Sequence, residues 1–311
     1  MTNALEIIPY HGWKKNVRLS NGAIELIVAL DVGPRVIHLG FNGGRNVFGE
    51  FPEQLGRSGE SGWVLRGGHR LWVGPEDKAL TYEPDNGPVD FEEIPDGIRT
   101  MQKPGPRTGI RKIMEIRMLP DRNEVEVIHQ LVNAGPLPVT CAPWALSVMA
   151  ARGTAIVPLP PLVLHDDRVT PNQNWSLWGY TDMTDPRLKI GTKYLLVRQE
   201  PGGKPFKLGL AEREGWVAYA VDGCLFTKRF ERDDSKPYPD GDVNLEVYTD
   251  ERILELETFA PVTTLAPGES VRHEERWSLD RCSGSCASED DVEAGVLPIV
   301  RGLSAGRARR G

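Results

Sequence analysis

The chain has 311 residues, of which 40% are hydrophobic and 26% charged, and its formal net charge at pH 7 is −7. This composition is too apolar for a disordered chain, and the acidic balance argues against nucleic acid or an anionic membrane as the main partner. The chain has four cysteines and no apolar run near the roughly 18 residues of a membrane span, so we expect a cytoplasmic protein with reduced thiols.

Alternation of apolar and polar residues recurs along the chain and predicts β-strands, beginning with segments 23–30, 35–41, 111–119 and 124–132 and ending with 272–279. Turn-forming pairs such as Asp222-Gly223 separate these segments. No window of 12 or more residues shows an apolar stripe of helical period, which excludes parallel α/β architectures. We therefore predict an all-β fold, a large antiparallel β-sandwich over residues 1–280, with residues 281–311 as a flexible tail.

Two stretches, 67–96 and 166–186, interrupt this pattern, and long loops inside a compact domain tend to be functional. The first begins Gly-Gly-His-Arg-Leu-Trp and continues with further carboxylate, aromatic and amide side chains. Aromatic faces and planar polar groups suit a neutral, polyhydroxylated ligand, so we expect a small-molecule sugar as partner. The alternative is a surface loop held by an Arg–Glu pair, with the tryptophan in the core. The residues of this stretch that we expect at the sugar site are His69, Arg70, Trp72, Glu76, Tyr82 and Asn86.

The segment 252–259 carries two glutamates on one strand face. Alternation places Glu255 and Glu257 on the face opposite Leu254 and Leu256. If this segment pairs as a hairpin with 244–248, Glu246 joins the same surface, and a carboxylate partly removed from water can act as a base near neutral pH. The alternative is a row of solvated charges on the outside of the sandwich.

Other candidate residues are scattered. We expect Trp144 to stack against sugar and His165, at the start of the second loop, to be a further pocket histidine; His129 lies inside a strand and is predicted to be a core group. The acidic run from Asp233 to Asp242 does not have the spacing of an EF-hand, and a solvated loop is the preferred interpretation. We predict no metal site.

At these residues the chain resembles the galactose mutarotase-like (aldose 1-epimerase) superfamily, in a bacterial branch of unassigned function. The Gly-Gly-His-Arg-Leu-Trp segment resembles the His-Gly-x-x-Arg-type loop of hexose-phosphate mutarotases, and Leu256-Glu257-Thr258 is similar to the Leu-Glu-Thr that carries the catalytic glutamate of galactose mutarotases. Ala142-Pro143-Trp144 looks like part of the strand–turn–strand before the second pocket motif, but the Asn-His of that motif has no counterpart here. The resemblance covers roughly residues 5–280.

The resemblance implies a supersandwich fold and interconversion of the anomers of an aldose. Glu257 would take the proton from the anomeric hydroxyl, while His69, or else His165, protonates the ring oxygen. Arg70, Glu76 and Trp72 would hold the sugar, and no metal or cofactor is needed. We accordingly expect His69, Arg70, Glu76 and Glu257 to converge on one face. The alternatives are a non-catalytic carbohydrate-binding module and a carbohydrate-cleaving enzyme with a carboxylate pair such as Glu76 and Glu257.

Overall fold

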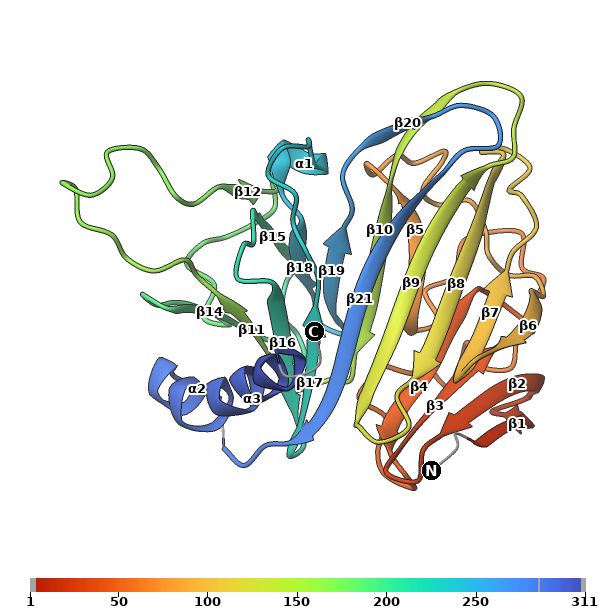
Figure 1. The fold of residues 1–311 in the computed structure, drawn as a ribbon, viewed down its shortest axis with the longest axis horizontal. Helices are drawn as coiled ribbons and strands as arrows, with labels where there is room; N and C mark the ends of the chain where they lie inside the picture. The colour runs from red at the N-terminus through yellow and green to blue at the C-terminus, as the bar shows by residue number, and fades with distance from the viewer. Residues whose placement is uncertain (1–3, 285, 309–311) are drawn as a thin grey trace.

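The computed structural model describes residues 4–284 and 286–308 and contains two large β-sheets that pack face to face (Figure 1). The pairings between the described strands are antiparallel. The described residues form 21 strands and only three short helices, α1 (Pro239–Asp242), α2 (Glu289–Gly295) and α3 (Leu297–Ala308). The predicted all-β antiparallel sandwich is confirmed.

The first sheet carries the candidate site. Its strands, in spatial order, are β1 (Ala4–Tyr10), β2 (Trp13–Ser20), β3 (Ile24–Ala29), β4 (Arg35–Phe41), β5 (Gly68–Gly74), β10 (Val139–Met149), β19 (Leu254–Phe259), β18 (Leu245–Thr249), β15 (Phe206–Leu210) and β12 (Trp175–Leu177), and β20 (Thr263–Leu265) pairs with the start of β10. Strands from both halves of the chain therefore meet in its centre.

The second sheet contains ten strands. In spatial order they are β13 (Leu188–Ile190), β14 (Tyr194–Arg198), β11 (Thr154–Pro158), β16 (Trp216–Val221), β17 (Cys224–Arg229), β21 (Ser270–Arg281), β9 (Glu124–Asn133), β8 (Ile110–Met118), β7 (Gly97–Met101) and β6 (Asp90–Ile94).

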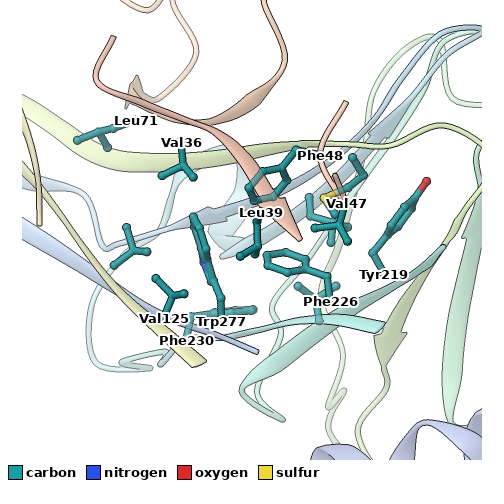
Figure 2. Close-up of a cluster of buried hydrophobic side chains, with 14 of the residues drawn as sticks. Val36, Leu39, Val47, Phe48, Leu71, Val125, Tyr219, Phe226, Phe230 and Trp277 are labelled. Carbon is teal, nitrogen blue, oxygen red and sulfur yellow. The ribbon is translucent and has the colours of Figure 1, made fainter. Parts of the chain in front are cut away.

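The main hydrophobic core lies between the two sheets (Figure 2). Val36 and Leu71 of the first sheet point toward Phe226 and Trp277 of the second. Phe48 packs edge-to-face on both aromatic rings, with centroid distances of 5.5 and 5.7 Å. Each such side chain contributes about 1.5–3 kcal/mol by leaving water. This packing holds the first sheet against the second. The side chains on the opposite, outer side of the first sheet therefore project from a rigid support.

The C-terminal segment differs from the flexible tail that we expected. In the described residues it forms α2 and α3, which lie beside β16 and β17 (Figure 1). Ser288 caps α2 in a reciprocal pair with Asp291. Val292, Val296 and Val300 are buried against an apolar patch of the second sheet. Their four-residue spacing is a helical signal. Because it is divided between two short helices, it does not extend over the 12-residue window in which the sequence analysis looks for a helix. None of the helices in the described part of the chain is long and apolar enough to cross a membrane.

Candidate functional site

A row of side chains crosses the outer face of the first sheet. Arg70 of β5 is opposite Leu146 of β10, which is opposite Glu257 of β19, and Glu257 is opposite Glu246 of β18. The hairpin that brings Glu246 beside Glu257 pairs the two segments whose pairing the sequence analysis considered as a condition. Because side chains alternate along a strand, residues of this row point away from the main core.

Two further rows flank the first one. On one side, Trp72 is opposite Trp144, which is opposite Phe259. On the other side, Glu255 and Lys207 are both opposite Tyr248, which lies between them. We call the following seven residues the carboxylate face: Arg70, Trp72, Trp144, Lys207, Glu246, Glu255 and Glu257.

The Lys207 ammonium is shared by two carboxylates. Its Nζ lies 2.7 Å from Glu246 Oε2 and 3.0 Å from Glu257 Oε2. It also lies 4.8 Å from the ring centroids of both Trp144 and Trp178. Trp144 Nε1 donates a hydrogen bond to Glu257 Oε2 at 3.1 Å. The carboxylate of Glu257 is therefore held in one orientation from two sides.

Negative charge accumulates on this face, and the carboxyl pKa values reflect it. Burial raises the pKa of Glu246 well above its usual range, and Glu257 adds to that rise. Burial and the neighbouring Glu257 raise the pKa of Glu255 to about 7. For Lys207, burial alone lowers the pKa, but Glu257 and Glu246 outweigh it and raise the pKa well above the ordinary lysine value. Glu255 is thus a carboxyl group of this face that takes up a proton near neutral pH.

Arg70 is held between aromatic rings and has unused donors. Its guanidinium carbon lies 4.0 Å from the ring centroid of Trp72 and 4.9 Å from that of Trp63. Its Nη2 is 4.0 Å from Glu255 Oε1, and burial lowers the pKa of the guanidinium. Arg70 Nε and Nη1, Glu255 Oε1 and Trp63 Nε1 are buried without a hydrogen-bond partner among the described residues. Buried polar atoms of this kind are uncommon, and a bound ligand would satisfy them.

Both irregular segments predicted to be functional reach this face. From the first, Tyr82 packs on Trp72 with a centroid distance of 5.1 Å, and its hydroxyl donates to Glu76 Oε1 at 2.5 Å. From the second, Trp178 contacts Lys207, and the Thr181 hydroxyl donates to the Lys207 carbonyl. The half-buried rings of Trp63, Tyr82 and Trp178 lie at the edge of the face.

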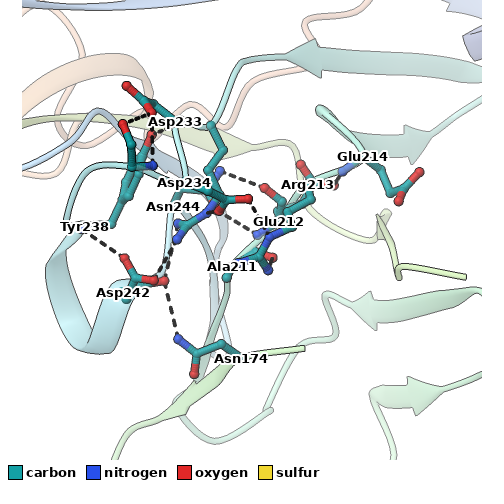
Figure 3. A network of polar contacts seen from close by, with 12 residues as sticks. Asn174, Ala211, Glu212, Arg213, Glu214, Asp233, Asp234, Tyr238, Asp242 and Asn244 are labelled. Carbon is teal, nitrogen blue, oxygen red and sulfur yellow. Dashed lines mark hydrogen bonds and ion pairs between the residues drawn. The ribbon is translucent and has the colours of Figure 1, made fainter. Parts of the chain in front are cut away.

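A third segment adds Tyr238, which belongs to the aromatic cluster beside Trp144. Figure 3 shows the polar network that holds it. The Tyr238 hydroxyl accepts a hydrogen bond from the Asp233 backbone N–H at 2.9 Å, and the Tyr238 N–H donates to Asp242 Oδ1 at 3.2 Å. Asp234 forms an ion pair with Arg213 at 3.0 Å. The acidic run is therefore an internally bonded loop.

His69 does not lie on the carboxylate face, which corrects the expectation that it shares a face with Glu257. It precedes Arg70 in β5, so alternation turns it into the space between the sheets, where it is fully buried. Its Nε2 lies 2.7 Å from His129 Nε2, and its Nδ1 lies 2.8 Å from Ser147 Oγ. No histidine in the described part of the chain hydrogen-bonds or stacks with the carboxylate face.

His69 belongs to a buried group that we call the histidine cluster, which contains His69, His129, Lys228, His273 and Glu275. Lys228 Nζ lies 3.0 Å from Glu275 Oε1, and Thr258 and Trp277 also donate to this carboxylate. Burial alone raises the pKa of Glu275, but Lys228 and the three histidines outweigh it and hold the pKa far below its usual range. Burial is the main cause that lowers the pKa of His129 to about 4 and that of His273 to about 3.

The histidine cluster is also the one group in the described residues with the donor types of a metal site. Ligand-type atoms of His69, His129 and Glu275 lie within 4.8 Å of one another. The His129 Nδ1–H donates to the His273 carbonyl at 3.1 Å, so the neutral His129 accepts the Nε2–H of His69 at its own Nε2. All three groups are thus already bonded, and the Lys228 ammonium lies beside the carboxylate. We interpret the cluster as a closed hydrogen-bond network.

Two other predicted site residues lie away from the face. His165 is on an exposed loop, and its ion-pair partner is Asp166 at 3.6 Å. Asn86 is buried; its amide donates to the carbonyls of Glu60 and Gly62 and accepts from Arg66. Asn86 therefore holds the loop before β5. The sequence analysis missed Lys207. Alternation in β15 places its side chain on one face of the strand and the apolar side chains of Phe206 and Leu208 on the other face.

A cavity of about 630 Å³ lies elsewhere, against the outer side of the second sheet. Glu124, Glu126, Arg272 and Arg276 are among its lining residues. Arg276 is paired with both glutamates, so much of the charge in this cavity is neutralised from within. The carboxylate face, with its unbalanced charges and unsatisfied atoms, is the stronger candidate for a ligand site.

No protein-family model and no curated protein sequence matches the chain. Its fold is similar to those of several solved structures. A Klebsiella pneumoniae protein, assigned provisionally as an aldose 1-epimerase, is 13% identical with a TM-score of 0.61, over 97% of this chain and 88% of that one. A galactose mutarotase-like protein from Lactobacillus casei is 11% identical with a TM-score of 0.59, over 85% and 100%. Another from Clostridium acetobutylicum is 9% identical with a TM-score of 0.56, over 90% and 99%. The chain has the galactose mutarotase-like fold.

Proposed function

We propose that the chain binds a sugar on the carboxylate face and interconverts its anomers, as an aldose 1-epimerase-like mutarotase. The observation that carries this proposal is the position of Glu257, which is oriented by Lys207 and by Trp144, a member of the aromatic cluster on this face. The fold, which is similar to that of galactose mutarotase-like proteins, supports it.

Mutarotation requires two proton transfers. A base takes the proton of the anomeric hydroxyl while an acid protonates the ring oxygen, and the C1–O bond of the ring breaks. After rotation about C1–C2, the hydroxyl that was the ring oxygen attacks the carbonyl carbon and returns its proton to the acid group. The new anomeric oxygen takes the other proton back from the base. Each transfer by a positioned side chain contributes typically about 10² to 10⁴ in rate.

Glu257 is the base in this proposal. Its Oε2 accepts from Lys207 and Trp144, whereas no described residue donates to its Oε1. Oε1 is therefore available to the anomeric hydroxyl. The ammonium of Lys207 offsets the negative charge of the carboxylate.

Glu255 replaces His69 as the proposed acid. It lies two residues from Glu257 on the same strand face, roughly 7 Å away along the strand. Burial and the neighbouring Glu257 raise its pKa to about 7, so its neutral form, which can donate a proton, is accessible near neutral pH. A proton donor with a pKa near the working pH is the most effective kind.

Half-buried rings provide the apolar contacts that a sugar requires. Trp63, Tyr82 and Trp178 are partly exposed beside the carboxylates. Their faces would cover the C–H patches of a pyranose, and the unsatisfied donors of Arg70 would bind its hydroxyls.

A second candidate function is sugar binding without catalysis. It is favoured by one observation: no described histidine contacts the carboxylate face, where the resembling enzymes use one. Measurement of anomer exchange separates the two functions, because a binding module does not accelerate it.

The test is exchange NMR or polarimetry with a panel of aldoses, applied to the parent and to Glu257→Gln. The variant keeps the shape and one acceptor but cannot take a proton, so we expect a loss of exchange of about 10² or more. Glu93→Gln, an exposed site in β6, is the matched control and should keep full activity. A parent that leaves exchange at the spontaneous rate but binds sugar would support the binding module. Equal rates for parent and Glu257→Gln would show that the base is another residue.

A further inference from the structure

A turn of the second irregular segment lies beside the carboxylate face. The edge strand β12 pairs with β15, and their register places Trp178 opposite Lys207, one position beyond the last paired residues. The chain then reverses its direction, because the Thr181 N–H donates a hydrogen bond to the Trp178 carbonyl at 2.9 Å. Gly179 and Tyr180 are the two central residues of this turn.

Both ends of the turn contact the same lysine. At the first end, the ring centroid of Trp178 lies 4.8 Å from Lys207 Nζ. At the second end, the Thr181 hydroxyl donates to the Lys207 carbonyl, and Thr181 Oγ1 is 3.2 Å from the Lys207 backbone nitrogen. The turn is therefore fixed to the residue whose ammonium group orients Glu257.

Tyr180 remains exposed although it belongs to this fixed turn. Solvent reaches 49% of its surface, and its hydroxyl has no hydrogen-bond partner among the described residues. A single exposed apolar side chain is common on protein surfaces, so the position of the ring decides its role.

The charges of the carboxylate face reach the Tyr180 hydroxyl. Burial is the main cause that raises the pKa of Tyr180 to about 12; Lys207 opposes the rise, whereas Glu257, Glu76 and Glu246 add to it. Such effects weaken with distance and are screened by water, so the hydroxyl lies near all of these groups. The phenol stays neutral at physiological pH, and its oxygen can both donate and accept a hydrogen bond.

We propose that Tyr180 is a substrate-binding residue that covers the sugar from the solvent side, with its ring against C–H groups and its hydroxyl bonded to a sugar hydroxyl. The inference rests on the proposed function, because it adds a residue to the same site. An aromatic ring with a polar tip suits a ligand that has both apolar patches and hydroxyl groups. Thr181 is a positioning residue, since its hydroxyl fixes the turn to β15.

The test is calorimetric titration of the full chain at pH 7 with glucose, galactose, mannose and N-acetylglucosamine. Tyr180→Ala should weaken the binding of the best-bound sugar about tenfold, because the ring and the hydroxyl are both lost. Tyr180→Phe keeps the ring and should weaken the same binding about threefold. Leu164→Ala removes a side chain that is 73% exposed on the preceding loop; as the control, it should bind sugar like the parent.

Exchange kinetics separate the binding role from a chemical one. Tyr180 takes no part in the proton transfers, so Tyr180→Ala should raise KM about tenfold and change kcat less than about threefold. Thr181→Val, which loses the hydroxyl, should raise KM about threefold, whereas Thr181→Ser, which keeps it, should behave like the parent. The midpoint of urea denaturation should be the same for Tyr180→Ala and the parent, because the side chain is half exposed.

The possible outcomes are distinct. If the parent binds a sugar and Tyr180→Ala binds it equally well, the inference is overturned and the proposed function stands. A lower kcat with an unchanged KM in Tyr180→Ala also overturns the binding role. If Tyr180→Ala does not fold, Tyr180→Phe decides, since equal affinity of this variant and the parent overturns the bond from the hydroxyl. Failure of the parent to bind any of the four sugars overturns the proposed function and this inference with it.

Discussion

Charged groups are buried on both sides of strands β5 and β19, but the two sides differ in how many of the buried polar atoms have a hydrogen-bond partner. On the inner side, the histidine cluster leaves none of its buried side-chain nitrogen or oxygen atoms without a hydrogen-bond partner among the described residues. On the outer side, Nε and Nη1 of Arg70 and the Oε1 atoms of Glu246 and Glu255 are buried without a hydrogen-bond partner among the described residues. A closed network stabilises the fold by itself, whereas an open one is completed by a ligand.

The balance of charge also differs between the histidine cluster and the carboxylate face. In the histidine cluster, one carboxylate meets one ammonium and three imidazoles, which hold the pKa of Glu275 far below its usual range despite burial. On the carboxylate face, two carboxylates share Lys207, and burial with mutual repulsion raises the pKa of Glu255 to about 7. The consecutive residues His69 and Arg70 therefore have different roles: His69 belongs to the buried network of the fold, and Arg70 belongs to the proposed site.

The largest expected effect is the loss of the ion pair inside the histidine cluster. Glu275→Ala leaves the Lys228 ammonium buried without its partner, so we expect a loss of about 3–5 kcal/mol in the free energy of unfolding. Urea denaturation measures it. The adjacent Glu274→Ala, on the exposed side of β21, is the control and should cost less than about 0.5 kcal/mol. A loss below about 1 kcal/mol for Glu275→Ala would remove the distinction between the two sides.

The next effect concerns pH. The pKa of Glu255 is raised from an unfolded value near 4.3 to about 7, so the folded state binds its proton more tightly. This contribution to stability is complete below about pH 4.3 and is lost as the pH rises to about 7. The parent should therefore lose more stability than Glu255→Gln between pH 5 and pH 8, by up to about 3 kcal/mol. Identical pH profiles for the two proteins in urea denaturation would contradict the raised pKa.

A smaller effect is expected for His69, which sequence analysis placed at the catalytic centre. His69→Leu removes both ring nitrogens, so His129 Nε2 loses its donor and is left as a buried, unsatisfied acceptor, which costs about 1–3 kcal/mol. Anomer exchange per folded molecule should remain as in the parent. Loss of exchange in a variant that is still fully folded would restore His69 as a catalytic residue.

The smallest effect on stability is expected where the proposed effect on catalysis is greatest. Glu257→Gln leaves Lys207 paired with Glu246 and removes one of two carboxylates that repel each other. We expect a change of less than about 1 kcal/mol in the free energy of unfolding, measured by the same denaturation. A loss of 3 kcal/mol or more would indicate that Glu257 is a structural group like Glu275.

Much of the carboxylate face could be predicted from the sequence, because it depends on local rules. Alternation in 252–259 and the hairpin with 244–248 were sufficient to place Glu246, Glu255 and Glu257 together. The same alternation, applied to 68–74, separates His69 from Arg70, but that segment was interpreted as a loop instead of β5. The histidine cluster could not be predicted, since His129 and His273 meet His69 through pairing and packing of strands distant in sequence.

The most direct test of the account is a crystal structure of the chain with a bound aldose. We predict that the sugar ring lies against Trp178 or Tyr82, with its anomeric hydroxyl about 3 Å from a carboxyl oxygen of Glu257. Arg70 or Glu255 should gain the hydrogen bonds that they lack. A sugar bound instead in the cavity beside Arg272, with the carboxylate face unchanged, would contradict the assignment of the site.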